Sequence, residues 1–141
     1  MATAKQNETF ADTLATVLHQ DAEHTVYRLG GADGEVVQTV FPVFPGIEIV
    51  YHDVHATACA MQRTRAPGCL EIHHCREGRM DYAASDNLVA YTAAGDMKLD
   101  LREQHTGTFH FPSCHSHGLT VAFDRNIVKE SLPCEVRDFP A

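Results

Sequence analysis

The sequence predicts an all-β domain, closed as a jelly-roll barrel, with a short helix at each end. From Thr25 onward, short β-branched or aromatic runs alternate with turn residues at intervals of about 8 to 12 residues, a pattern typical of all-β domains. The chain of 141 residues is long enough to bury one core but short for two. Many short strands leave two sheet edges to cover, and a barrel or jelly roll covers them.

The first expected element is an amphipathic helix over residues 8–20. Thr9 is available as its N-cap, and the segment contains neither Gly nor Pro. Apolar side chains recur there at helical spacing: Phe10, Leu14, Val17 and Leu18. At the other end, Asp124 is placed to cap a short helix over residues 126–132, which Pro133 ends.

Between these helices the predicted strands cover residues 25–29, 35–44, 47–52, 69–75, 79–84, 87–92, 97–101 and 119–123. Turn segments separate the strands and supply the positive-φ and Asx-turn residues that tight reversals require: residues 30–34, 45–46, 67–68, 77–78, 85–87 and 94–96. Residues 79–92 are expected to form a hairpin.

Composition and charge exclude several classes of protein. The net charge of −8 repels phosphate backbones, so this chain alone is not expected to bind DNA. No apolar run approaches the roughly 20 residues of a membrane span, and no signal peptide precedes the domain, so we expect a cytoplasmic protein without membrane contact. The 5 cysteines form no C-x-x-C pair, which argues against a disulfide scaffold.

Several linked motifs then point to a family. Residues 67–79 read PGCLEIHHCREGR, which closely resembles the first barrel motif of one branch of AraC-type transcription regulators, approximately PGxLEINHCxEGR. Other runs resemble the same branch, in the same order: FPGIE at 44–48, YHDVHA at 51–56, AGDM at 94–97 (similar to GxGDL) and FPSCHSHGLTV at 111–121 (similar to FPxxxxHGIxI). The resemblance extends over residues 44–124.

The resemblance implies a cupin-like effector-binding domain over residues 1–124. Residues 125–141 would then begin a helical linker toward two helix-turn-helix units, which bind DNA in full-length family members and are absent from this chain. A small-molecule effector of unknown identity, a homodimer and DNA contact only through the missing C-terminal domain are implied as well. Since residues 138–141 show no periodic element or cap, we expect the chain to be a piece of a longer protein.

Alternation along a strand places Glu71, His73 and Cys75 on one face. That face either lines a pocket or forms the solvated side of a half-buried strand, and the sequence leaves both readings open. The candidate ligand-binding residues are Glu71, His73, Cys75, His110, His117 and His55.

Histidines also raise the question of a metal. Two groups offer ligands: His52 with His55, and His110, Cys114, His115 with His117. Metal-binding cupins are similar to one another in a G-x5-H-x-H-x3,4-E-x6-G motif. Here the corresponding run is Gly68-x4-His73-His74-x2-Glu77, which lacks the alternating histidine pair. His115 and His117 do alternate but fall where a loop is expected to enter a strand. We therefore expect no bound metal and no cofactor.

For catalysis the sequence offers little, because it contains no G-x-S-x-G elbow, phosphate loop, dinucleotide fingerprint or H-E-x-x-H. The leading hypothesis is a non-enzymatic sensing module. A stand-alone metal-dependent cupin enzyme, such as a dioxygenase or isomerase, is the second. The third is a thiol-based redox sensor that uses Cys75 or Cys114.

Overall fold

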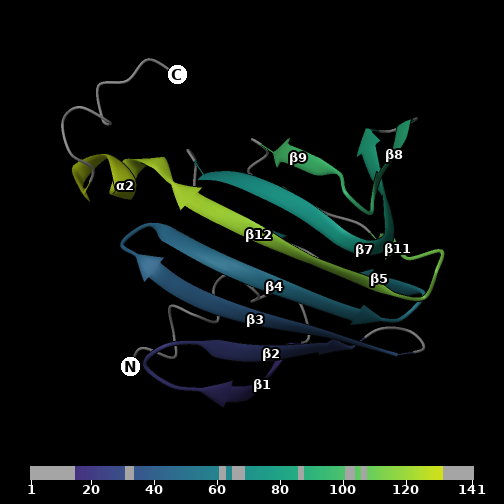
Figure 1. Cartoon of the computed structure of the whole chain (residues 1–141), viewed down its shortest axis with the longest axis horizontal. Coiled ribbons are helices and arrows are strands. Elements are labelled where there is room, and N and C mark those ends of the chain that lie inside the picture. The colour runs from purple at the N-terminus through teal and green to yellow at the C-terminus, as the bar shows by residue number, and fades with distance from the viewer. Residues whose placement is uncertain are drawn as a thin grey trace.

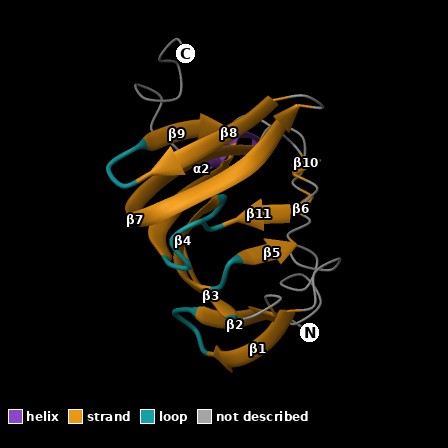
Figure 2. Ribbon diagram, turned by 90° about the vertical axis from the view of Figure 1, so that its right-hand side faces the viewer, coloured by secondary structure: helices purple, strands orange, loops and turns teal. Residues whose placement is uncertain are grey.

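The fold of the computed structural model is an antiparallel sheet curled into a half-barrel (Figures 1 and 2). The structure describes residues 15–30, 34–60, 63–64, 69–85, 88–100, 104–105 and 108–131. The elements are β1 (Ala15–Gln20), β2 (Thr25–Gly30), β3 (Glu35–Phe44), β4 (Ile47–His55), β5 (Ala58–Ala60), β6 (Arg63–Thr64), β7 (Cys69–Ser85), β8 (Leu88–Ala93), β9 (Met97–Asp100), β10 (Gln104–His105), β11 (Thr108–His110), β12 (Ser116–Asp124) and α2 (Arg125–Ser131). The predicted all-β, cupin-like class is confirmed.

One 10-stranded sheet contains nearly all of these strands, in the order β1-β2-β3-β4-β12-β7-β11-β5. Strands β8 and β9 both pair with the long strand β7, and β10 pairs with β6 in a separate ladder. The central pairs are β4 with β12 and β12 with β7, both antiparallel. Segments far apart in the sequence therefore form the middle of the sheet, where the residues of interest lie.

The predicted N-terminal helix is wrong over Ala15–Gln20, which form strand β1, and its residues 8–14 lie outside the described part of the chain. Strand β1 pairs with β2, so tertiary pairing overrides the helical spacing of the apolar residues. Val17 and Leu18 are 44% and 48% exposed, so the stripe that predicted a helix is not buried.

The predicted C-terminal helix is confirmed as α2. Asp124 caps it, because its Oδ1 accepts hydrogen bonds from the backbone N–H groups of Asn126 at 3.0 Å and Ile127 at 3.4 Å. The helix lies at the end of the barrel that β12 leaves (Figure 1). Among the described residues, no helix is both long and apolar enough to span a membrane.

Strand β7 joins two predicted strands, residues 69–75 and 79–84, into one strand of 17 residues. The expected reversal at Glu77 and Gly78 is absent, and a β-bulge takes its place. Opposite β12, Cys75 pairs with Gly118 and Glu77 pairs with His117, which leaves Arg76 as the extra residue. The predicted hairpin that follows is confirmed, since β7 pairs with β8 from Arg79 to Ser85.

Gly78 makes this bulge possible. Its φ is +82°, and a Cβ there would overlap the carbonyl oxygen of His115. The extra residue also shifts the alternation of β7, so Glu77 faces the same side as His117 and not the side of Cys75. The bulge therefore places the Glu77 side chain on the same face of the sheet as His117.

The core lies on the concave side of the sheet. Its buried cluster is Tyr27, Leu29, Val36, Val54, Ala56, Cys59 and Phe111. Three of these residues, Val36, Val54 and Phe111, also line a cavity. The core therefore supplies the apolar part of the candidate site.

Candidate functional site

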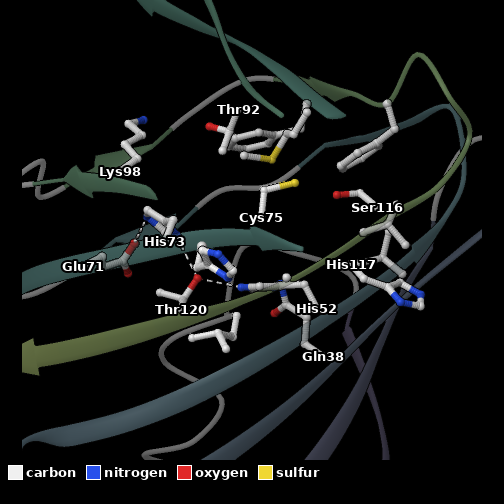
Figure 3. Close-up of a pocket in the computed structure, with 18 residues that line it drawn as sticks. Gln38, His52, Glu71, His73, Cys75, Thr92, Lys98, Ser116, His117 and Thr120 are labelled. Atoms are coloured by element: carbon white, nitrogen blue, oxygen red, sulfur yellow. Dashed lines mark hydrogen bonds and ion pairs between the residues drawn. The ribbon is translucent and has the colours of Figure 1, made fainter. Parts of the chain in front are cut away.

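A cavity of about 100 Å³ lies inside the half-barrel, against β3, β4, β7 and β12 (Figure 3). Apolar side chains form much of its wall: Val36, Val54, Met80, Phe109, Phe111 and Leu119. Polar side chains from the same strands interrupt this wall, among them Gln38, His52, Glu71, His73 and Thr120. The face of Glu71, His73 and Cys75 thus lines a cavity, which is one of the two readings that the sequence left open.

The polar residues form one continuous chain of hydrogen bonds and an ion pair across the four strands β3, β4, β12 and β7. Gln38 Nε2 lies 3.0 Å from His52 Nδ1, and His52 Nε2 lies 2.7 Å from Thr120 Oγ1. On the other side of the hydroxyl, His73 Nδ1 lies 2.8 Å from Thr120 Oγ1. His73 Nε2 then lies 3.1 Å from Glu71 Oε2. We call these five residues the inner polar chain.

In the inner polar chain each group donates a hydrogen bond to the next, from Gln38 toward Glu71. An amide N–H only donates, so Gln38 requires an unprotonated Nδ1 on His52, whose Nε2–H then donates to Thr120. The Thr120 hydroxyl has one proton, which it donates to His73 Nδ1. His73 Nε2–H then faces the Glu71 carboxylate. This assignment places one proton in each of the four contacts.

Burial makes these contacts energetically important. Gln38 and Thr120 are 0% exposed and Glu71 is 5% exposed, so water does not replace a lost partner there. Lys98 of β9 also lines the cavity, with its Nζ 3.8 Å from the centroid of the Tyr82 ring. In Figure 3 the lysine lies near Glu71 and His73, at one end of the cavity.

Cys75 lines the cavity as well, but its surroundings favour the thiol. Burial is the main cause that raises its pKa, and its Sγ donates to the carbonyl oxygens of Glu77 at 3.5 Å and Gly78 at 3.7 Å. A reactive cysteine needs a lowered pKa. Cys114 is exposed, in a turn where its φ is +56°. Of the two proposed redox cysteines, Cys75 therefore has the less suitable environment.

The remaining candidates from the sequence lie elsewhere. His117 borders the cavity, but its ring points away from Glu71 and His73 in Figure 3. His55 is on the outer side of β4, close to His117. His110 is exposed on β11 and is not among the described residues that line the cavity.

Sequence reasoning missed two members of the inner polar chain, Gln38 and Thr120, and considered His52 only as a metal ligand beside His55. One signal was present for His52, which lies between Val50 and Val54 at the spacing of one strand face. Both valines are buried, and the His52 side chain points to the same side. No comparable signal marked Thr120, because its role depends on a contact with β4 and β7 at once.

On the outer face of the sheet, three histidines and two carboxylates meet. We call His55, His115, His117, Asp53 and Glu77 the outer histidine cluster. Asp53 Oδ1 lies 2.8 Å from His55 Nε2 and 2.6 Å from His117 Nε2. Glu77 Oε2 lies 2.9 Å from His115 Nε2 and 3.8 Å from His117 Nδ1. The hydrogen bond from His115, followed by the charge of His117, lowers the pKa of the Glu77 carboxyl.

Comparison with known proteins supports the fold. No protein-family model and no curated protein matches the sequence. Solved structures do match. A Klebsiella pneumoniae protein with a double-stranded β-helix domain aligns with a TM-score of 0.51 and 14% identity, over 77% of this chain and 83% of that one. FeII HppE aligns with a TM-score of 0.55 and 12% identity, over 77% and 60%.

A mutant of the Bacillus subtilis oxalate decarboxylase OxdC aligns with a TM-score of 0.52 and 13% identity, over 82% of this chain and 28% of that one. The chain thus spans less than two thirds of the HppE and OxdC chains. At these identities the likeness shows the double-stranded β-helix fold alone. That fold includes enzymes among its members, so the activity must be argued from the site.

The inner polar chain does not fit an iron such as the one that HppE is named with. His52 uses both ring nitrogens, for Gln38 and Thr120. His73 also uses both, for Thr120 and Glu71. A ring nitrogen that already shares a proton has no free lone pair for a metal. The interior is instead a small apolar cavity with fixed polar groups in its wall.

Proposed function

We propose that this chain is the ligand-sensing and dimerising domain of an AraC-type transcription regulator, and that its effector is a small polar molecule bound in the cavity. One observation carries the proposal: the inner polar chain lies in the wall of an otherwise apolar cavity. Small-molecule sites typically combine apolar walls with a few fixed polar groups. In this reading Glu71, His73 and Cys75 are ligand-binding residues, and His55, His110 and His117 are not.

The size and polarity of the cavity narrow the ligand class. An engineered cavity of about 150 Å³ holds benzene. The 100 Å³ here fits a compact molecule of at most about six heavy atoms. Glu71 and Lys98 both line the cavity, and a hydroxyl group can donate to the carboxylate and accept from the ammonium group, so hydroxyl groups fit better than acidic groups. The best ligand class is therefore a short neutral polyol with one apolar side.

The regulatory part of the proposal depends on the family resemblance of residues 44–124. Residues 1–124 would be the sensing domain, and 125–141, which include α2, would begin the linker toward a DNA-binding domain. The net charge of −8 agrees with DNA contact through that other domain. A homodimer and a cytoplasmic location complete the proposal. Exposed apolar side chains on β8 and β9 are compatible with a second copy as partner: Leu88, Val89, Tyr91, Met97 and Leu99.

The competing function is a metal-dependent enzyme on the same fold. It requires a metal inside the cavity, and the occupied nitrogens of His52 and His73 argue against one. Elemental analysis separates the two functions. A stoichiometric metal that is lost in His73→Ala would favour the enzyme, whereas a metal that is retained in His73→Ala lies outside the cavity.

The test of ligand binding is a calorimetric titration with a panel of short polyols, for example glycerol, ethane-1,2-diol and propane-1,2-diol. A ligand that binds only the folded state at 100 times its Kd stabilises it by about 2.7 kcal/mol, so thermal shifts provide a first screen. We expect at least one polyol to bind the wild-type protein and Thr120→Val to lose that binding. The matched control is Thr39→Val, on the outer side of β3, which should bind as the wild type does.

Two results would overturn this part of the proposal: no polyol binds, or Thr120→Val binds as tightly as Thr39→Val. The regulatory part has its own test, the reading frame that follows Ala141. We expect it to continue for about 150 basic, helix-rich residues that form DNA-binding units. An immediate stop codon in the natural gene would contradict it.

A further inference from the structure

We propose that His55, His115 and His117 bind a divalent transition-metal ion on the outer face of the barrel, with zinc as the ion of choice. This inference does not depend on the sensing function, because the residues lie on the opposite side of the sheet from the inner polar chain. Nitrogen ligands from histidine are the common ligands of zinc and its neighbours in the first transition row.

The fold brings the three histidines together from separate segments. His55 ends β4, His115 lies in the turn before β12, and His117 is the second residue of β12. The pairing of His117 with Asp53 on β4 sets the register of this group. The bulge at Arg76 then brings Glu77 opposite His117 on the same face.

The distances between the rings fit a shared ion. One nitrogen of each ring lies within 4.8 Å of one nitrogen of each of the others. Tetrahedral zinc with Zn–N bonds of about 2.0–2.1 Å needs these nitrogens roughly 3.4 Å apart. The side chains of His55, His115 and His117 are 58%, 35% and 38% exposed, so small χ rotations close that difference without disturbing the core.

An unsatisfied nitrogen supports the metal directly. His117 Nε2 is closed off from solvent and has no hydrogen-bond partner among the described residues. Asp53 Oδ1 is only 2.6 Å away, but its direction is not that of an N–H···O bond. Buried polar atoms are nearly always satisfied, and a metal ion bound to this nitrogen would satisfy it.

The two carboxylates complete the site. Metal-bound histidines usually donate their other N–H to a carboxylate, which fixes the ring. Glu77 is in that position for His115, with a hydrogen bond of 2.9 Å, and Asp53 forms an ion pair with His55 at 2.8 Å. The carboxylates of Asp53 and Glu77 also bring negative charge to the cluster, which attracts a divalent cation.

The second group of this kind, His19, Asp21 and His24, serves as the internal control. It lies in the β1–β2 turn, and Asp21 is already bound to the backbone N–H groups of Glu23 at 2.8 Å and His24 at 2.9 Å. Its three residues are close in sequence, so a turn alone explains why they meet. It has the same residue types without a buried unsatisfied nitrogen among the described atoms.

The experiment is a calorimetric titration of metal-free protein with ZnCl₂, followed by the absorption spectrum of the Co²⁺ form. We expect one ion per chain with a Kd below about 1 μM and the intense visible bands of tetrahedral cobalt. His55→Ala and His115→Ala should each weaken binding about 100-fold, and Asp53→Asn about 10-fold. His19→Ala and His24→Ala should change the Kd less than twofold. Circular dichroism verifies that each variant is folded.

Three results would overturn the proposal. The first is no saturable binding of one ion. The second is a Kd that His55→Ala and His115→Ala leave unchanged, which would mean that the cluster holds only ion pairs between histidine and carboxylate. The third is an equal loss in His19→Ala, which would place the ion in the β1–β2 turn. His73→Ala should retain zinc, so failure here leaves the polyol test of the cavity unaffected.

Discussion

The inner and outer faces of the same three strands, β4, β7 and β12, use histidine and carboxylate in opposite ways. On the inner face, both nitrogens of His52 and His73 have partners, and Gln38, Glu71 and Thr120 among these partners are buried. On the outer face, His117 Nε2 has none among the described residues, and the neighbouring rings are partly exposed. The residue type alone therefore does not tell whether a histidine is structural or a metal ligand. Whether its ring nitrogens already have hydrogen-bond partners is more informative.

The two faces should differ in what a substitution costs. Loss of an inner contact leaves a buried partner unsatisfied, so it lowers the free energy of unfolding. When an outer histidine is removed, water can form hydrogen bonds with the groups that it contacted. In metal-free buffer, such a substitution should therefore leave the free energy of unfolding nearly unchanged. An outer substitution should lower stability only when zinc is present, because zinc that binds only the folded state stabilises the wild type and not the variant.

The largest expected effect comes from Gly78→Ala, at the bulge that divides the faces. Alanine there combines a φ of +82° with an overlap onto the backbone of His115. We expect a loss of about 3 kcal/mol in the free energy of unfolding, measured by chemical denaturation, together with a loss of zinc affinity.

Gly95→Ala is the matched control for this substitution. Gly95 has a similar φ of +91°, but a Cβ there meets no atom within 4 Å. The expected loss is about 1–2 kcal/mol from the backbone alone, with zinc affinity unchanged. Equal losses in the two variants would show that the bulge adjusts freely and does not fix the position of Glu77.

The next largest effect is expected from Thr120→Val, in the middle of the inner polar chain. Valine has the same shape but removes the hydroxyl that His52 and His73 share. We expect a loss of about 2 kcal/mol, because two part-buried ring nitrogens lose their partner. Thr39→Val on the outer face should stay within about 0.5 kcal/mol of the wild type. Equal changes in chemical denaturation would mean that the inner polar chain contributes nothing specific to stability.

Only part of the inner face could be predicted from the sequence, and less of the outer face. Alternation correctly grouped Glu71, His73 and Cys75, because β7 is regular up to Cys75. The bulge at Arg76 then shifts the residues that follow it to the opposite face. The sequence of one strand alone does not indicate which of its residues bulges. Glu77 therefore could not be placed beside His117 from sequence.

The ends of the chain illustrate the same limit. The Asp124 cap could be predicted because a cap depends on residues next to one another. The helix over residues 8–20 failed at Ala15–Gln20 because pairing with β2 decides the structure there. Contacts within one element follow from sequence, whereas contacts that join β4, β7 and β12 depend on register.

The smallest expected effect concerns Asp21, in the third histidine–carboxylate group. Its pKa is held well below the ordinary carboxyl range, first by the hydrogen bond with His19 and then by the backbone N–H groups of His24 and Glu23. Because the folded pKa is lower than the unfolded one, the ionised carboxylate stabilises the fold above the ordinary Asp value of about 4. This contribution disappears as pH falls toward the folded pKa.

Asp21→Asn should therefore be less stable than the wild type at neutral pH, and the difference in Tm should shrink as pH falls below about 4. The effect is small because Asn still accepts the two backbone hydrogen bonds of the turn. Glu23→Gln, which removes a neighbouring charge of the same sign, should show a smaller change with pH. A difference that grows toward acid pH would mean that Asp21 stabilises the fold in its protonated form, contrary to its place as an acceptor of three hydrogen bonds.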